Sequence, residues 1–319
     1  MNFRFSNGRI NDRKTGGVAT RVAFALVMSI RLAFGAPHVV VYCAQDQLYA
    51  EPIFRQFEKQ TGVRVRAVYD NEAVKTVGLA NRLLAEKNHP VCDVFWGNEE
   101  MRTRLLESQS AFRPTNGWAS FGFRSRRLVI NTNLLSASAA PRSLMDLTNS
   151  DWRGKIAFAY PQFGTTATHF HALRQHWGAS VWEAWCRGLA ANHPFLVDGN
   201  SEVVKAVGRG DRVVGMTDSD DIADGQREGL PVAALPLTAE MLLIPNTVGI
   251  IRGAPDPQSA QQLFEYLQTP AVLQQLVTAQ ALEGPMRGTP VPESLAVNWQ
   301  AVLRDVDRTT ADLNRFFLR

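Results

Sequence analysis

The residues that follow position 37 alternate between short apolar runs and amphipathic segments, and this alternation limits the fold more than any other feature. Residues 38–44 (HVVVYCA) and 91–97 (VCDVFWG) are apolar runs typical of buried strands, and residues 63–69 (VRVRAVY) alternate as strands do. Between them, residues 48–62 and 72–87 carry apolar side chains near helical spacing. A strand–helix–strand–helix–strand order predicts an α/β protein with a parallel sheet.

The same order returns later in the chain and predicts a second lobe. Strands are expected at 155–161, 195–199 and 212–218, with helices from 169 and 201–210 between them. A tail from Pro257 is expected to be mostly helical, with breaks around residues 284–290.

Two further strands, at 125–135 and 241–253, lie between these sets and predict two crossings from one lobe to the other. The 319 residues, 45% of them hydrophobic, are enough for two cores. We therefore predict a two-lobed α/β fold with two crossing strands. Its first lobe would hold residues 36–127 and 246–319, and its second lobe residues 128–245.

The basic charge of the chain is concentrated at its beginning. Residues 1–35 hold six of the 34 basic residues and one of the 30 acidic ones, which leaves 28 basic and 29 acidic residues beyond them. This balance gives no reason to expect nucleic-acid binding. A basic stretch, the apolar run 22–30 and small residues at 33–36 predict an export signal cleaved near Gly35, although Arg31 interrupts the pattern. The apolar run is too short for a membrane anchor, the alternative interpretation.

Three cysteines, Cys43, Cys92 and Cys186, cannot all pair because their number is odd. The ends of parallel strands that would carry Cys43 and Cys92 lie far apart. We expect all three to be buried thiols that pack as small hydrophobic side chains.

The two lobes imply a cleft, and ligands of open α/β sheets bind beyond the carboxyl ends of the strands. The polar loops at these ends supply candidate ligand-binding residues from both lobes. From the first lobe they are Asp46, Asn71, Glu72, Lys75, Asn98 and Glu99. The alternatives are a helix-start acid for Glu72, a surface charge for Lys75 and helix capping for Asn98 and Glu99. From the second lobe they are Gly164, Thr165, Thr166, Asn200, Asp218, Asp220 and Asp221.

The stretch FGTTATH, residues 163–169, joins a predicted strand to a predicted helix. Unpaired N–H groups and a partial positive charge at a helix start can hold an anion, and Gly164 would let it approach closely. Thr165 and Thr166 add hydroxyl donors. Ordinary helix capping by threonine is the alternative. The turn DGNS, 198–201, offers Asn200 at a second helix start, again either as a cap or as a ligand group.

The stretch TDSDD, residues 217–221, places Asp218, Asp220 and Asp221 after a strand. Three carboxylates can bind a hard cation or an ammonium group, although Asp221 can equally cap the next helix. The spacing is not that of a calcium loop.

The sequence favours a binding protein over an enzyme. It contains no G-x-S-x-G nucleophile turn, and no cysteine is placed beside a histidine as a nucleophile. An exported enzyme on the same scaffold remains the alternative from another class, because fold does not fix function.

Several stretches together resemble the periplasmic ferric-iron-type solute-binding proteins of ABC importers. The resemblance covers about residues 38–290 and rests on the combination rather than on one motif. The matching stretches include FEKQTGVRVRAVYDNEAVKT, NHPVCDVFWGNEE, DWRGKIAFAYPQFGTTATH, DGNSEVVKAVGRGD, GMTDSDDIADGQREGLPVA and IPNTVGIIRGAPDPQSAQQLFEYL.

The resemblance implies a periplasmic, monomeric protein that needs no cofactor, closes on a ligand by a hinge and delivers it to a membrane permease. In iron-binding members, two adjacent tyrosines after the last strand of the second lobe bind Fe³⁺, and here Ser219 and Asp220 take those places. A histidine that some members carry in the first lobe is replaced near Asp46. The acid after the DVFW strand is offset, as Asn98 and then Glu99.

These departures favour a small anionic ligand, such as an organic phosphate or phosphonate, over iron. The family's anion-binding positions match Gly164, Thr165, Thr166 and Asn200. A zwitterion would place its phosphonate on the threonines and its ammonium group on Asp218 or Asp220. Fe³⁺ held by carboxylates and a synergistic anion remains an alternative cargo, with Glu99, Asp218 and Asp220 as candidate ligands.

Overall fold

A computed structural model describes residues 1–2, 37–70, 75–286 and 293–318 of the chain. Residues 38–319 form one unit, and the description that follows concerns that unit alone. The expected export signal and its cleavage near Gly35 lie outside the described residues, apart from the first two. Among the described residues, no helix combines the length and the apolar character that crossing a bilayer requires.

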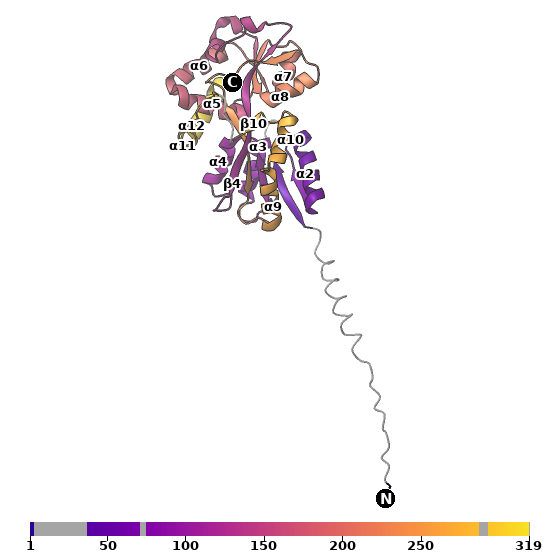
Figure 1. Ribbon diagram of the computed structural model, residues 1–319. Coiled ribbons are helices and arrows are strands. Elements are labelled where there is room, and N and C mark those ends of the chain that lie inside the picture. The colour runs from indigo at the N-terminus through magenta and orange to yellow at the C-terminus, as the bar shows by residue number, and fades with distance from the viewer. Residues whose placement is uncertain (3–36, 71–74, 287–292, 319) are drawn as a thin grey trace. The chain divides into compact units, whose positions relative to one another are not determined.

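Parallel strands and surrounding helices build the first lobe, the lower one in Figure 1. β1 pairs in parallel with β2 on one side and with β3 on the other, as the apolar runs predicted. The strands are β1 (His38–Cys43), β2 (Arg64–Val68) and β3 (Val94–Gly97); the helices are α2 (Gln47–Thr61), α3 (Lys75–Ala85), α4 (Glu100–Ser108), α9 (Pro257–Leu267) and α10 (Pro270–Thr278). The buried faces of α2 and α9 pack with β1 and β3 around side chains such as Phe57, Trp96 and Leu263.

The second lobe repeats this plan. β5 pairs in parallel with β6 and with β7. The strands are β5 (Ile156–Ala159), β6 (Phe195–Val197), β7 (Val214–Asp218) and β8 (Val232–Ala234); the helices are α5 (Gly164–Trp177), α6 (Ala179–Ala191), α7 (Asn200–Gly208) and α8 (Ser219–Arg227). Three short 3₁₀ helices, Ala137–Ala139, Met145–Thr148 and Ser150–Trp152, precede β5.

Two antiparallel strands connect the lobes, which confirms the two predicted crossings. β4 (Trp118–Asn131) pairs with β9 (Leu243–Ile250) along its first half and with β7 and β8 along its second half. The strand order is β2-β1-β3-β9-β4-β7-β5-β6, and the short β10 (Gly284–Pro285) also pairs with β4. The register places Arg126 directly opposite Asp218, and this pairing positions the site described below.

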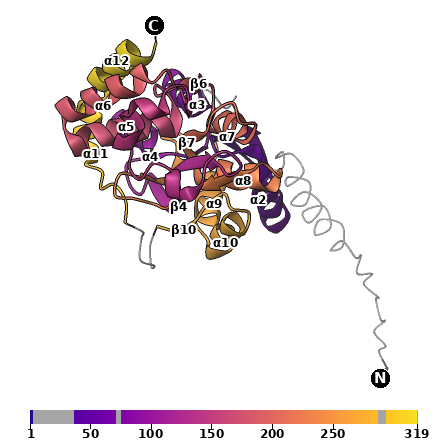
Figure 2. The same ribbon diagram turned by 90° about the horizontal axis from the view of Figure 1, so that it is seen from above.

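The last helices lie elsewhere than the sequence suggested. The residues 246–319 were expected to complete the first lobe, but α12 (Val306–Phe317) packs into the core of the second. Phe317 contacts the rings of Phe158 and Phe170, with ring centroids 5.5 and 5.9 Å apart. Figures 1 and 2 both show α11 (Trp299–Arg304) and α12 beside α5 and α6, away from α9 and α10. Burial of aromatic side chains decides this placement, and helical periodicity alone carries no information about it.

α5 begins at Gly164, five residues earlier than the predicted start at His169. The threonines of its first turn therefore belong to the helix, although threonine is a weak helix former. Thr165, Thr166 and Thr168 are all buried, so tertiary packing outweighs their low helix propensity.

The three cysteines are buried and form no disulfide, as expected from the sequence. Burial raises the pKa of the Cys92 and Cys186 thiols well above the ordinary value, which keeps both thiols protonated.

Candidate functional site

A pocket opens where loops of both lobes meet, at the carboxyl ends of β1, β3, β5, β6 and β7. Nine of the thirteen residues predicted from the sequence line it. They are Asp46, Asn98, Gly164, Thr165, Thr166, Asn200, Asp218, Asp220 and Asp221. The other lining residues are Thr76, Arg124, Ala159, Tyr160, Phe163, Asp198 and Gly199. Strand topology therefore brings together side chains that are far apart in sequence.

Three helices of the second lobe begin at this pocket. Their N-cap residues are Phe163 for α5, Gly199 for α7 and Asp218 for α8, and none of these makes a side-chain capping hydrogen bond. The first N–H groups of a helix have no partner within the helix, so they remain available unless a cap or a ligand satisfies them. Each helix start also carries a partial positive charge, and here three such charges converge.

Asp218 forms the centre of a buried hydrogen-bond network beneath the helix starts. Its Oδ2 accepts hydrogen bonds from Thr165 Oγ1 at 2.7 Å and Asn200 Nδ2 at 3.1 Å. Its Oδ1 accepts one from Arg126 Nη1 at 2.7 Å. Burial opposes ionisation, but Arg126 and Arg124 hold the pKa of Asp218 below its usual value, so it is a carboxylate. The hydroxyl of Thr165 is therefore occupied, and only its backbone N–H faces the helix start.

Arg124 and Arg126 were not among the residues predicted from the sequence. Both side chains are almost fully buried, with 3% and 1% of the residue surface exposed. They lie two residues apart on β4, and successive side chains of a strand alternate between its faces, so both point the same way. The signal in the sequence is this i, i+2 pair of arginines inside a strand that crosses between the lobes. The predicted crossing strand began at residue 125, and Arg124 fell outside it.

Arg124 connects several parts of the pocket. Its Nη2 lies 3.3 Å from Asp218 Oδ2, and its Nε lies 3.2 Å from Asp220 Oδ1. Its Nη1 donates a hydrogen bond of 3.0 Å to the carbonyl oxygen of Asn98, while the Asn98 side chain accepts one of 2.8 Å from Thr76. Asn98 therefore orients Arg124 through its backbone.

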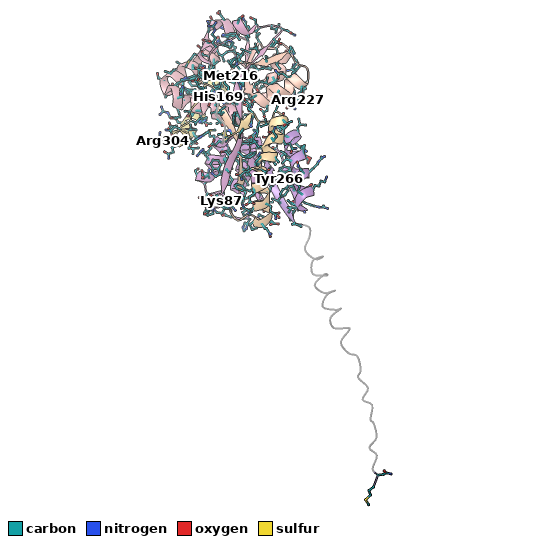
Figure 3. The ribbon with its side chains drawn as sticks, in the orientation of Figure 1. Lys87, His169, Met216, Arg227, Tyr266 and Arg304 are labelled. Carbon is teal, nitrogen blue, oxygen red and sulfur yellow. The ribbon has the colours of Figure 1, made fainter. Side chains whose placement is uncertain are left out.

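Three polar contacts outside the pocket link the lobes. Thr168 of α5 donates a hydrogen bond of 2.9 Å to Glu99, at the start of α4. Arg227 of α8, labelled in Figure 3, donates to Tyr49 of α2 at 2.8 Å and to the carbonyl oxygen of Ala279 at 3.2 Å. Relative movement of the lobes has to break or remake these contacts.

The comparisons with known proteins agree with this geometry. A family model described as a bacterial extracellular solute-binding protein matches residues 39–279. The chain belongs to this family. Its members bind solutes and are not enzymes, which agrees with the binding function expected from the sequence.

The relatives and fold neighbours include proteins with two kinds of ligand. The Fe(3+)-binding periplasmic protein of Serratia marcescens is 30% identical over 209 residues, 58% of this chain and 60% of that protein. The match thus spans less than two thirds of this relative's length. Iron-bound HitA from Pseudomonas aeruginosa superimposes with a TM-score of 0.77 at 18% identity, over 87% of this chain and 99% of HitA. AfuA from Actinobacillus pleuropneumoniae, with fructose-6-phosphate bound, superimposes with a TM-score of 0.75 at 17% identity, over 89% of this chain and 99% of AfuA. At these identities the structural likeness confirms the two-lobed α/β fold alone.

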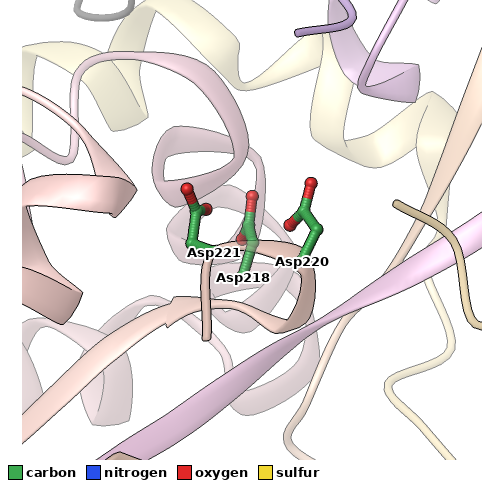
Figure 4. A group of neighbouring side chains, drawn as sticks. All are labelled: Asp218, Asp220 and Asp221. Carbon is green, nitrogen blue, oxygen red and sulfur yellow. The ribbon is translucent and has the colours of Figure 1, made fainter. Parts of the chain in front are cut away.

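Three aspartates lie close together after β7. Oxygen atoms of Asp218, Asp220 and Asp221 lie within 4.8 Å of one another, and Figure 4 shows the carboxylates pointing to the same side of the turn. Asp218 and Asp220 already form ion pairs with Arg124. A cation at this position would face two guanidinium groups, and this arrangement disfavours a metal ion.

Asp220 is an acid of the pocket with a raised pKa. Burial raises its pKa to about 7, Arg124 opposes that shift, and the neighbouring Asp218 and Asp46 add to it. Near neutral pH this side chain therefore exchanges a proton readily, and the pocket changes charge with it.

Glu99 does not line the pocket, contrary to the expectation that it binds the ligand or a metal. Its side chain caps α4 by accepting hydrogen bonds of 2.9 and 3.1 Å from the Arg102 N–H group, and it also accepts one from Thr168. An acid at the N-cap of a helix satisfies the first-turn N–H groups, and that local pairing turns Glu99 away from the pocket.

Three further candidates are not placed. Asn71 and Glu72 lie outside the described residues, and the side chain of Lys75 does as well. Their roles in ligand binding stay predictions from the sequence.

Proposed function

We propose that this solute-binding protein serves an ABC importer and captures a small organic anion with a phosphate or phosphonate group. The observation that carries the proposal is the convergence of three helix starts without side-chain caps, those of α5, α7 and α8, on one pocket. Helix starts bind phosphate groups through backbone N–H donors and through the helix dipole.

The positive charge of Arg124 supports binding of an anion. Arg124 lines the pocket, and its Nε, which is paired with Asp220 Oδ1 at 3.2 Å, makes no well-oriented hydrogen bond among the described residues. A buried donor in this state is satisfied when a ligand oxygen reaches it. Protonation of Asp220, which has a pKa of about 7, would leave more of the guanidinium charge for that ligand.

The rest of the pocket calls for hydrogen-bond donors on the ligand. Asp46, Asp198 and Asp221 line it with carboxylate groups, which accept hydrogen bonds and repel anions. A phosphate-bearing sugar or an aminoalkyl phosphonate would place its anionic group at the helix starts and its hydroxyl or ammonium groups on these acids. The ammonium partner expected from the sequence was Asp218 or Asp220. Because Asp218 already accepts hydrogen bonds from Arg126, Thr165 and Asn200, the other acids that line the pocket are candidates as well.

Ligand capture would use movement of the lobes. Groups of the first lobe, Asp46, Thr76 and Asn98, and groups of the second, from Gly164 to Asp221, line one pocket. A ligand that contacts both sets shifts the lobes toward the closed arrangement by as much as its affinity for the closed arrangement exceeds its affinity for the open one. The closed protein would then deliver the ligand to a membrane permease on the outer side of the inner membrane. The AfuA structure with fructose-6-phosphate supports a phosphate-bearing ligand on this fold.

Ferric iron is the second candidate cargo, favoured by the aspartate group and by the iron-binding relatives. It would need to displace Arg124 from Asp218 and Asp220 or to bind with an anion that compensates the guanidinium charge. Carboxylate oxygens and a synergistic anion would then take the place of the tyrosine pair.

Native mass spectrometry of the gently purified protein, with metal analysis of the same sample, separates these candidates. A retained organic phosphate or phosphonate supports the proposal. Stoichiometric iron overturns it in favour of the second candidate. Calorimetric titration with fructose 6-phosphate, aminoethylphosphonate and ferric citrate then ranks the ligand classes. Phe163→Asp, which introduces a cap at the start of α5, serves as a site variant, and Phe163→Ala as its matched control.

A further inference from the structure

A second cavity, with a volume of about 710 Å³, lies between helices of the two lobes and is not the cleft described above. α3 and α4 line it from the first lobe, and α5 and α12 from the second. From α5 it receives Phe163, Ala167 and His171, at a spacing of four residues. Side chains at this spacing share one face of a helix. Phe163 lies in both cavities and separates them.

Buried polar atoms without partners gather in this cavity. They are Nδ1 of His171, Nε of Arg102, and both Oε1 and Nε2 of Gln162; none has a hydrogen-bond partner among the described residues. His171 is only 3% exposed. Leaving such an atom unpaired costs about 1–3 kcal/mol, and native proteins keep few of them. The cleft has a similar signature among the described residues, because Arg126 Nε has no hydrogen-bond partner and the ion pair between Arg124 Nε and Asp220 Oδ1, 3.2 Å apart, is not oriented as a hydrogen bond.

The unpartnered atoms of the second cavity are mainly donors. Arg102 offers an N–H group and Gln162 offers an NH₂ group and one acceptor. Thr310 Oγ1 lies 3.5 Å from His171 Nε2, and a hydroxyl that donates there leaves the imidazole proton on Nδ1, as a third donor. Burial, with Arg102 and Arg174 nearby, lowers the pKa of His171 to about 3, so the ring is neutral.

Much of the rest of the wall is apolar, and Asn81, Gln109, Asp307 and Asn314 add polar groups to it. Its apolar side chains include Leu84, Met101, Leu105 and Ala167. A cavity with clustered donors and apolar walls suits a molecule with an acceptor-rich head and a hydrocarbon body.

We propose that this cavity is a second ligand site, which binds a small amphipathic carboxylate with its oxygens on Arg102, Gln162 and His171. The hydrocarbon part packs against Leu105 and Ala167. Because both lobes line the cavity, an occupant contacts both and stabilises the arrangement of the lobes described here. If the cleft ligand stabilises the same arrangement, the two ligands bind cooperatively. By thermodynamic linkage, each ligand then raises the affinity for the other by the same factor.

Calorimetry with sodium hexanoate tests the site, with hexan-1-ol as a neutral probe of similar length. We expect saturable binding of hexanoate, and binding of hexan-1-ol weaker by at least about tenfold, a factor that corresponds to about 1.4 kcal/mol. Arg102→Gln and Gln162→Ala should each weaken hexanoate binding by at least about fivefold, as expected for loss of one hydrogen bond to a charged group. Arg104→Gln is the matched control on the same helix, because Arg104 pairs with Glu100 and does not line the cavity.

Three results overturn the proposal. One is the absence of saturable hexanoate binding up to about 10 mM, well above the millimolar range of weak specific sites, which would show a cavity filled by water. Another is equal binding of hexanoate and hexan-1-ol, which would show an apolar void. The third is unchanged binding in both site variants. Circular dichroism and urea unfolding establish that Arg102→Gln folds, and Gln162→Ala tests the site independently if it does not. Failure of hexanoate binding leaves the proposal for the cleft untouched, because that proposal depends on other residues and other probes.

Discussion

Helices that begin at the cleft differ from helices that begin elsewhere. α5, α7 and α8 start at the pocket without side-chain caps. In contrast, the side chains of Asp256, Thr269 and Asn298 cap α9, α10 and α11, and Glu99 caps α4, which begins next to the pocket residue Asn98. α2 lacks a side-chain cap as well, and its N-cap residue Asp46 also lines the pocket. α6 and α12 lack side-chain caps too, but each follows within two residues of the end of another helix.

The absence of side-chain caps at the cleft has a consequence for stability. A side-chain cap stabilises a helix by about 1 kcal/mol, and at the pocket this stabilisation is absent while the backbone donors stay accessible. Asp218 shows the arrangement most clearly. It occupies the N-cap position of α8, yet its carboxylate accepts hydrogen bonds from Arg126, Thr165 and Asn200 instead of capping the helix. The second-lobe helix starts at the pocket thus forgo the stability of side-chain caps, and this absence of caps supports the proposed anion site.

The largest effect should come from Arg126, which holds Asp218 away from the start of α8. We expect Arg126→Met to destabilise the protein by about 3–5 kcal/mol, because it leaves a buried carboxylate poorly compensated. Arg55→Gln is the control, since the Arg55–Glu51 pair is largely exposed and should contribute less than about 0.5 kcal/mol. Urea unfolding measures both. A loss below about 1 kcal/mol for Arg126→Met would show that Asp218 does not depend on the arginine.

The next effect is the pH dependence caused by Asp220. Its pKa is raised to about 7 in the folded protein, so the folded state binds more protons than the unfolded state between about pH 4 and 7. Its contribution to the free energy of unfolding therefore falls as pH rises through that range, by about 2–4 kcal/mol at 1.36 kcal/mol per pKa unit. The difference between wild type and Asp220→Asn isolates this contribution from those of His169 and His171. Parallel stability profiles for the two proteins would contradict an elevated pKa.

A cap introduced at the pocket tests the comparison directly. In Phe163→Asp, the new carboxylate can accept hydrogen bonds from the first N–H groups of α5, which should stabilise the helix and block the anion site. We expect the affinity for fructose 6-phosphate or aminoethylphosphonate, whichever binds more tightly, to fall at least about tenfold. Phe163→Ala removes the same partly exposed ring without adding a cap, and it should retain affinity within about threefold. Equal losses in the two variants would show that the ring, rather than the open helix start, is required.

Removal of a cap far from the pocket should have the smallest effect on function. Thr269 caps α10 by accepting a hydrogen bond from the Val272 N–H group. Thr269→Ala should lower the free energy of unfolding by about 1 kcal/mol and leave ligand affinity unchanged. Thermal unfolding and calorimetry on the same sample test both statements, and a change in affinity would argue against a separation of the two sets of helices.

Most of the fold could be predicted because its local patterns agree with its topology. The apolar runs of β1 and β3 and the spacing in α2 and α9 indicate strands and helices without knowledge of their partners. Once the strands are parallel, the loops at their carboxyl ends must converge, which is why Asp46, Asn98 and Thr165 could be placed in one cleft.

The remainder depends on contacts that a sequence pattern does not contain. Arg124 and Arg126 acquire their role from the pairing of β4 with β7, which joins residues more than ninety positions apart. Glu99 looks like either a ligand group or a helix cap in the sequence, and the local geometry of α4 shows that it is a cap. The placement of α12 depends on where Phe316 and Phe317 find a core, and amphipathicity cannot reveal this.

The most direct test of the account is a crystal structure of the protein with its retained or tightest-binding ligand, with diffraction also measured at the iron absorption edge. The account predicts a phosphate or phosphonate group within hydrogen-bond distance of the backbone nitrogens of Thr165 and Thr166 and near Arg124, with no iron signal. An iron atom coordinated by Asp218, Asp220 or Asp221, with the starts of α5 and α7 free of any anion, would contradict it.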